Sequence, residues 1–208
     1  GAALGDRFGR KRVFMLGLGV FTFASALSAL APSAQALIAA RALLGVGAAM
    51  VTPLTLTLLS EAVPVERRAA AIGAWAGIGG LGVAMGPVVG GAVVNGLAWQ
   101  WIFWLNVPIG LILLALSTRF LTESRGPNAK LDLPGVGLAS VGLTSLVFGI
   151  VRASDIGWSA AATLASLSTG AILLIGFVVW EHRSPAPMLP LRFFKSRAFT
   201  ATNLTGMA

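Results

Sequence analysis

The sequence has no cysteine, a single histidine and few charged residues. Without cysteine, disulfide bonds and thiolate metal sites are excluded from these 208 residues. Charged residues make up 11% of the chain, whereas soluble domains have about 25%. So few charges cannot cover the surface of a soluble domain of this length. Hydrophobic residues amount to 56% and the mean hydropathy is +0.86, so the composition predicts a chain that lies in a lipid bilayer.

The sequence also lacks the motifs of enzymes and of ATP-driven pumps. It has no cluster of metal-ligating residues, no phosphate-binding loop after a strand and no Gly-Lys-Ser/Thr string. His182, beside Glu181, is interpreted as a solvated residue, and it is the one histidine that could serve as a base in a nucleophilic set. We therefore expect no cofactor and no metal. A membrane enzyme, a sensor and a passive channel are the less favoured alternatives.

Six apolar runs are each long enough to cross a bilayer as a helix. They cover residues 13–31, 36–63, 69–94, 101–121, 134–152 and 163–180. Because lipid offers no water to backbone polar groups, each run should be helical, and the alternating pattern of a membrane β-barrel is missing. The predicted fold class is an all-α polytopic membrane protein with six transmembrane helices.

Basic residues alternate along the segments that flank and connect these runs. Counted with Arg119 and Arg152, which lie at the ends of their runs, the segments hold in chain order four, zero, two, zero, three, one and four Lys or Arg residues. This gives thirteen against one, with Arg41 well inside a run. The rich segments should face the cytoplasm, which places both ends of the chain there and Trp99, Trp101, Trp104 and Trp158 at the outer interface. The net charge of +8 would alone suggest nucleic-acid binding, but basic residues in short clusters between apolar runs argue against it.

The stretch GDRFGRKR at residues 5–12 combines one acid, one internal glycine and several bases. An acid near a helix end can accept backbone N–H groups and pair with an arginine, and glycine permits a tight reversal of the chain. The positive-inside rule would explain the bases but not this spacing. The pattern resembles the signature loop between helices two and three of the major facilitator superfamily of transporters, with Ala2 at the family's leading glycine. The resemblance implies a cytoplasmic gate motif of Asp6, Arg7, Gly9, Arg10 and Lys11.

Arg41 lies inside the second run, about two turns from its predicted outer end. A charge at that depth is costly and marks a functional residue, although an arginine reaching back to the interface is the alternative. Gly45 and Gly47 follow it as in the arginine motif of helix four of the superfamily. The resemblance implies that this arginine, as in drug:proton antiporters of that family, helps the proton to reach or leave its acidic carrier.

Charges also flank Pro64 at the predicted inner end of the second run. They are Glu61, Glu66, Arg67 and Arg68. They could pair with Asp6 or Arg10 as part of a gate, or they could be ordinary solvated charges, and the sequence does not choose between these.

The third run carries glycines at intervals of four residues, which places them on one helix face and lets a second helix approach closely. Pro87 removes a backbone donor and should bend the helix. Small residues alone would fit any packing face, but the string G-x-x-x-G-P-x-x-G-G resembles the antiporter motif on helix five of drug exporters. The resemblance implies a bent helix at the domain interface that limits leak. The motif comprises Gly82, Gly86, Pro87, Gly90 and Gly91.

The stretch WQWIFWLNVPIG at 99–110 resembles the entry to helix six of fourteen-helix drug exporters. A twelve-helix relative would show a long polar loop after residue 121. On this resemblance, residues 1–121 are parent helices three to six, 122–198 are two extra central helices with their loops, and 199–208 begin the next helix. We therefore expect an internal piece of a longer protein, whose C-terminal half would be its partner.

No acidic residue lies in the middle of a run. The seven acids are Asp6, Glu61, Glu66, Glu123, Asp132, Asp155 and Glu181. Proton coupling needs an embedded ionisable group, so either coupling is absent or the carrier lies outside this sequence, and the resemblance favours an Asp in helix one.

The predicted function is efflux of drugs or other small amphipathic, often cationic, compounds across a bacterial cytoplasmic membrane. Proton antiport by alternating access would drive it, so the expected partners are a small molecule, protons and the bilayer, and no nucleic acid. The alternative is a transporter of the same fold for a dedicated metabolite or solute.

Overall fold

The computed structural model describes residues 1–126 and 132–184. The chain divides into two compact units, Gly1–Ala129 and Lys130–Ala208. The predicted loop at 185–198 and the predicted start of another helix at 199–208 lie outside the described residues.

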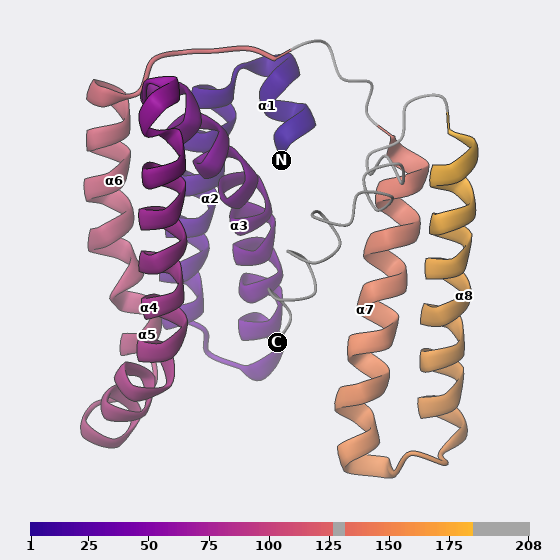
Figure 1. The fold of residues 1–208 in the computed structure, drawn as a ribbon. Helices are drawn as coiled ribbons and strands as arrows, with labels where there is room; N and C mark the ends of the chain where they lie inside the picture. Colours follow the sequence, from indigo (N-terminus) through magenta and orange to yellow (C-terminus); the bar gives the residue numbers. More distant parts are fainter. Residues whose placement is uncertain (127–131, 185–208) are drawn as a thin grey trace. The chain divides into compact units, whose positions relative to one another are not determined.

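Unit 1 is built from helices that begin and end close to the limits of the apolar runs (Figure 1). Its elements are α1 (Ala2–Phe8), α2 (Arg10–Ala29), α3 (Ala34–Ala62), the 3₁₀ turn η1 (Val65–Arg67), α4 (Arg68–Gly96), α5 (Trp101–Trp104) and α6 (Asn106–Phe120). Unit 2 contains α7 (Leu133–Ile156) and α8 (Ala161–Arg183).

Within the described ranges, six helical segments are long and apolar enough to cross a membrane. They are Arg10–Ala29, Ala34–Ala62, Val65–Gly96, Trp101–Phe120, Leu133–Ile156 and Ala161–Arg183. Each of these corresponds to one of the six predicted runs. The predicted all-α membrane class is confirmed.

The predicted loop over residues 5–12 was wrong in extent. Only Gly9 lies outside a helix there, since α1 ends at Phe8 and α2 begins at Arg10. The Gly9 backbone has φ of +108°, a conformation that glycine adopts without steric cost. Arg and Lys are good helix formers, so the bases on either side of the glycine stay helical.

Three other helix boundaries differ from the predicted ones. The run at 101–121 is interrupted at Leu105, between α5 and α6, and Pro108 sits in the first turn of α6, where no intrahelical N–H is required. Helix α7 continues to Ile156 and therefore includes Asp155 in its last turn. His182 is exposed, as predicted, but it belongs to the last turn of α8 rather than to a loop.

Helix α2 is the centre of unit 1 and packs mainly against α3 and α6. Gly17 of α2 and Gly47 of α3 allow the two backbones to approach, because a Cβ on Gly47 would lie 2.6 Å from the Phe21 nitrogen and 2.8 Å from the Gly17 oxygen. Toward the Asp6 end, Val13, Leu54 and Leu58 form the buried apolar cluster.

Unit 2 is a helical hairpin in which glycines of one helix face leucines of the other. Gly142 lies against Leu174, Gly149 against Leu167, and Gly170 against Leu146. Asp132 caps α7, since its Oδ1 accepts a hydrogen bond of 3.0 Å from the Gly135 N–H. The Trp180 indole of α8 donates to the same carboxylate at 2.8 and 3.0 Å, which ties the two helices together.

Candidate functional site

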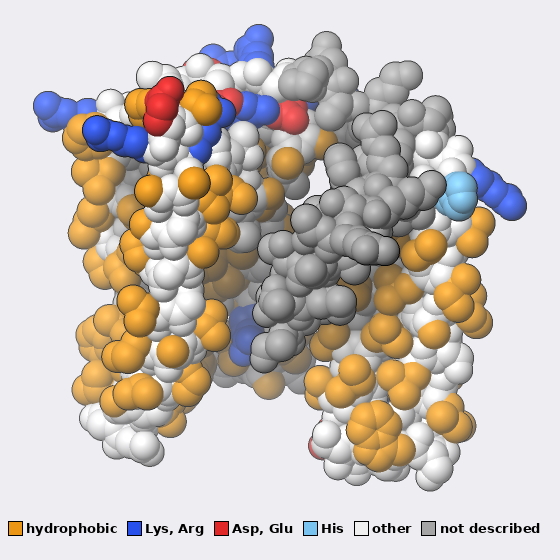
Figure 2. Space-filling model, in the orientation of Figure 1, with side chains coloured by type: hydrophobic (Ala, Val, Ile, Leu, Met, Phe, Trp, Pro, Cys, Tyr) orange, Lys and Arg blue, Asp and Glu red, His pale blue; other side chains and the backbone are white. Residues whose placement is uncertain are grey.

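Many charged residues of unit 1 gather at the end of the unit where α1 meets α2, and hydrophobic side chains cover much of the helices beyond them (Figure 2). We call this region, which contains Asp6, Arg10, Lys11, Glu61 and Glu123, the charged end.

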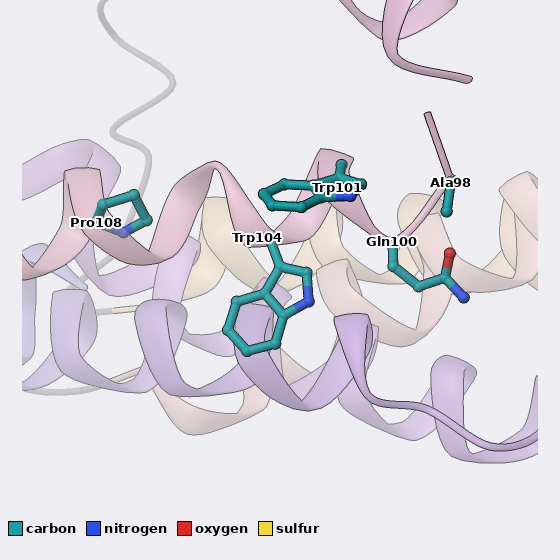
Figure 3. A pocket seen from close by; sticks show the side chains of 5 residues that line it. All are labelled: Ala98, Gln100, Trp101, Trp104 and Pro108. Atoms are coloured by element: carbon teal, nitrogen blue, oxygen red, sulfur yellow. The ribbon is translucent and has the colours of Figure 1, made fainter. Parts of the chain in front are cut away.

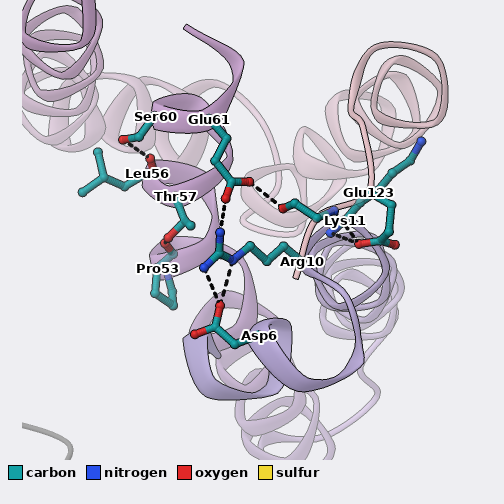
Figure 4. Close-up of polar contacts among 10 residues, drawn as sticks. Asp6, Arg10, Lys11, Pro53, Leu56, Thr57, Ser60, Glu61 and Glu123 are labelled. Atoms are coloured by element: carbon teal, nitrogen blue, oxygen red, sulfur yellow. Dashed lines mark hydrogen bonds and ion pairs between the residues drawn. The ribbon is translucent and has the colours of Figure 1, made fainter. Parts of the chain in front are cut away.

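Arg10 bridges two acids at the charged end (Figure 4). Its guanidinium lies 2.7 Å from Asp6 Oδ1 on α1 and also pairs with Glu61 at the end of α3. The Arg10 side chain is 14% exposed and that of Asp6 is 19% exposed, so water screens this pair less than a surface ion pair. One arginine therefore joins three helices.

The next residue, Lys11, joins α2 to α6. Its ammonium donates to the Thr118 carbonyl at 2.9 Å and to the Leu121 carbonyl at 2.6 Å. Its backbone N–H donates to Glu123 Oε1 at 3.1 Å. Lys11 thus contacts both the last turn of α6 and the segment that follows it.

The structure brings some predicted site residues together and leaves others apart. Asp6 pairs with Arg10, and Glu61 pairs with the same arginine, which is one of the two alternatives that the sequence left open for Glu61. Arg7 instead lies over the Phe8 ring, 5.3 Å from its centroid. In the part of the chain that the structure describes, no ion pair includes the other three charges near Pro64, which are Glu66, Arg67 and Arg68.

Three residues of the charged end were missed by the sequence analysis. Glu123, Ser124 and Gly126 follow α6 and contact the α1–α2 junction, although more than 100 positions separate them from it. The sequence offered one indication, an acidic residue directly after an apolar run that could pair with the three consecutive bases at 10–12. Sequence spacing alone could not show that the two segments meet.

Arg41 stands about 12 Å along α3 from its cap, Ser33. It lines a cavity of about 390 Å³ formed by α3, α5, α6 and the turn before α5. Among the described residues it makes no hydrogen bond or ion pair. The lining residues are Leu37, Arg41, Leu44, Trp99, Ile102, Phe103 and Asn106.

Side chains of the same cavity are held in place by their neighbours. Asn106 donates a hydrogen bond of 3.1 Å to the Ser25 hydroxyl of α2. Trp99 and Phe103 form an edge-to-face pair with ring centroids 6.2 Å apart. Arg41 is thus a cation beside fixed aromatic and amide groups, well inside a helix that is long enough to cross a membrane.

The glycine motif of α4 has no packing partner within the described residues. Positions 82, 86, 90 and 91 each have open space where a Cβ would stand, and no residue of α4 is buried among the described parts of the chain. Helix α4 nevertheless runs unbroken through Pro87. The motif is therefore an open helix face.

A family model described as the Major Facilitator Superfamily matches residues 1–205. The chain belongs to the major facilitator superfamily. The predicted resemblance is confirmed, and the chain is part of a multi-pass membrane transporter rather than an enzyme.

Several curated relatives of this superfamily match almost all of the chain. An uncharacterized transporter from Mycobacterium tuberculosis is 38% identical over 97% of the chain and 35% of its own length. The methylenomycin A resistance protein of Streptomyces coelicolor is 36% identical over 98% of the chain and 43% of its own length. The multidrug efflux pump LfrA of Mycolicibacterium smegmatis is 40% identical over 97% of the chain and 40% of its own length. The chain spans less than half the length of these relatives.

A second pocket lies among the aromatic residues at the opposite end of unit 1 (Figure 3). Its volume is about 430 Å³, and its lining is almost entirely apolar. The side-chain oxygen of Gln100 is shielded there and accepts no hydrogen bond from a described residue. The lining residues are Ala98, Gln100, Trp101, Trp104 and Pro108.

No group of three or more His, Cys, Asp or Glu residues that could hold a metal ion occurs within ranges 1–126 and 132–184. The contacts described at the charged end and around Arg41 are ion pairs, hydrogen bonds and apolar contacts.

Proposed function

We propose that this chain is part of a fourteen-helix exporter that expels drugs or other small amphipathic compounds from bacteria and confers resistance to them. Proton entry would drive export by alternating access, in which two halves of the transporter rock about a site near the middle of the membrane. The resistance and efflux names of the relatives support the substrate class.

Arg41 is the observation that carries the proposal. Arg41 lies about 12 Å along a helix long enough to cross a membrane and has no partner among the described residues. Burying such a cation in a membrane costs free energy, which favours a functional role for it. In this proposal it stabilises the deprotonated form of an acidic carrier and so helps that carrier to release its proton. The seven acids lie at helix ends or in connections, so we expect the carrier, an Asp in helix one, outside this sequence.

Under the positive-inside rule, the bases at the charged end support a cytoplasmic location for that end. Asp6, Arg7, Gly9, Arg10 and Lys11 then form the inner gate motif. The open α4 face of Gly82, Gly86, Pro87, Gly90 and Gly91 would pack against the other half of the transporter and limit leak.

One observation favours a second candidate. Because no described acid lies in the middle of a helix, an uncoupled transporter of the same fold for a dedicated solute would also fit the chain. The presence of an embedded Asp in helix one of the full-length protein would decide against this candidate.

Drug accumulation in cells tests the proposal directly. The full-length transporter is expressed in bacteria that lack their own exporters, and ethidium is used as a cationic fluorescent probe. We expect lower accumulation than in empty cells, and loss of the difference when a protonophore removes the gradient. Equal accumulation in both strains, across a panel of amphipathic compounds, would contradict drug export.

A further inference from the structure

The first backbone N–H groups of α2 have no hydrogen-bond acceptor within the helix or in the side chain of its cap residue. Its cap, Gly9, has no side chain, so the N–H groups of the first turn need acceptors from elsewhere. Arg10, Lys11 and Arg12 add three positive charges at the helix end that already carries positive partial charge. This end therefore requires acceptors and negative charge from another part of the molecule.

The segment that follows α6 supplies both. We call residues 121–126 the strap, which crosses the charged end from α6 to α1 (Figure 1). The Arg10 N–H donates to the Ser124 carbonyl at 2.9 Å, and the Lys11 N–H donates to Glu123 Oε1 at 3.1 Å. Glu123 Oε2 also lies 3.6 Å from Arg12 Nε, so one carboxylate serves a first-turn amide and one of the three bases.

The exchange is reciprocal, because α2 in turn caps α6. The Lys11 ammonium donates to the carbonyls of Thr118 and Leu121 in the last turn and at the end of α6. A cation is favourable at that end of a helix, where carbonyl groups lack intrahelical partners. The strap thus supplies acceptors to the start of α2, and Lys11 of α2 supplies a donor to the free carbonyl groups at the end of α6.

The strap also reaches the two acids that hold Arg10. The Ser124 hydroxyl donates to Glu61 Oε2, while Arg10 occupies the other oxygen of that carboxylate. At Gly126 a Cβ would overlap Asp6 Oδ1 and lie 2.6 Å from Arg10 Nη2. Glycine at this position therefore lets the strap pass close to the Asp6–Arg10 pair.

We propose that the strap and the start of α2 form a reciprocal helix cap that positions the gate motif, with Glu123, Ser124 and Gly126 as its positioning residues. The proposal rests on the transport function for its effect on turnover, and on geometry alone for the docking of the strap. Undocking should slow the conformational cycle and leave substrate affinity unchanged. The strap lies at the charged end, whereas Arg41 and its cavity lie at the opposite end of unit 1.

Hydrogen exchange tests the docking without any need for transport. In the full-length transporter, Gly126→Ala should speed exchange of the Arg10 and Lys11 amides about tenfold, which corresponds to one lost hydrogen bond. Gly137→Ala is the matched control, because nothing lies within 4 Å of that glycine's missing Cβ. Equal exchange in both variants and the wild type would overturn the reciprocal cap.

Transport kinetics test the positioning role. Ser124→Ala should lower the turnover of ethidium export several-fold, with the half-saturating concentration unchanged, and Ser124→Thr should restore it by keeping the hydroxyl. Ser60→Ala is the control, since among the described residues that hydroxyl bonds to the Leu56 carbonyl of its own helix and to no other group. A change in half-saturating concentration alone, or full turnover in Ser124→Ala, would overturn the positioning role. A wild type that exports nothing would instead refute the proposed function, and hydrogen exchange would still decide the docking.

Discussion

At the scale of single residues, small side chains decide where the helices of unit 1 meet. Gly17 and Gly47 bring the backbones of α2 and α3 into contact, and Gly110 of α6 lies against Thr22 of α2. In lipid there is no hydrophobic force between helices, so association depends on such close packing and on interhelical hydrogen bonds. The Asn106–Ser25 bond adds one of these between α6 and α2.

Replacing Gly47 with alanine should therefore weaken the contact between α2 and α3. The new Cβ would press on backbone atoms of Phe21 and Gly17, which cannot rotate away, and overpacking of this kind costs roughly 1–3 kcal/mol. We expect a lower melting temperature for the full-length protein in detergent. Gly45→Ala is the control, because its Cβ meets nothing within 4 Å and alanine favours the helix. A Gly47→Ala variant as stable as the Gly45→Ala variant would contradict this packing.

The sequence predicted that Asp6 could pair with a nearby arginine, without specifying which one. The structure pairs it with Arg10 across the junction of α1 and α2 at Gly9, so this pair depends on the turn of the chain there. For Glu61 the sequence left open whether it pairs with the gate motif or is an ordinary solvated acid, because its distance from Arg10 depends on how α3 ends. Glu123 and Ser124 were missed, since their role depends on the path of the chain after α6.

At the scale of helices, the hairpin of α7 and α8 is held by a carboxylate at one end and by interlocked glycines and leucines along its length. Asp132 is buried, at 8% exposure, and its hydrogen-bond partners are the Trp180 indole and the Gly135 N–H. These hydrogen bonds give Asp132 a structural role. The hairpin is thus a unit with its own internal fastening.

Trp180→Phe should loosen this end of the hairpin. The substitution keeps an aromatic ring and removes the N–H donor to Asp132, and one hydrogen bond to a charged group corresponds to about 1.5–3 kcal/mol. We expect at least tenfold faster hydrogen exchange at residues 133–136 in the full-length transporter. Trp158→Phe serves as the control, because Trp158 is 64% exposed. If both variants exchange at the same rate, the indole does not fasten the hairpin.

Helix α4 shows the opposite arrangement, an open face of small residues on a continuous helix. Gly86→Leu should lower export at least tenfold in a correctly folded full-length transporter, because the larger side chain would keep another helix from that face. Gly77→Leu is the matched control, since Gly77 lies on the opposite side of α4 by helical geometry. Similar export rates in the two variants would show that the motif face is not a packing surface.

Helix positions could be predicted because a bilayer sets a minimum apolar length, and each run was therefore found. The limits were less predictable where backbone conformation decides them. Gly9 alone ends α1, and the break at Leu105 comes just before Asn106 and Pro108, which indicate a helix start but not where the preceding helix ends. The open state of the α4 face also could not be predicted, because the motif indicates close packing without naming its partner.

At the scale of the whole molecule, the chain belongs to the major facilitator superfamily and spans less than half the length of its curated relatives. The charged end lies at one end of unit 1, and Arg41 lies toward the other. We propose that the charged end acts as the cytoplasmic gate and that Arg41 couples proton movement to export.

Proton flux in inside-out vesicles of the full-length transporter tests this claim most directly. A pH gradient, acid inside, is established, cationic drugs are added, and a pH-sensitive dye follows the release of protons. Arg152→Ala is the control, because Arg152 is also an arginine in a long helix but lies over the Phe148 ring near a helix end. We predict drug-dependent proton release by the wild type and by Arg152→Ala, and its loss in Arg41→Ala. Undiminished release in Arg41→Ala, or no release by a folded wild type, would contradict the account.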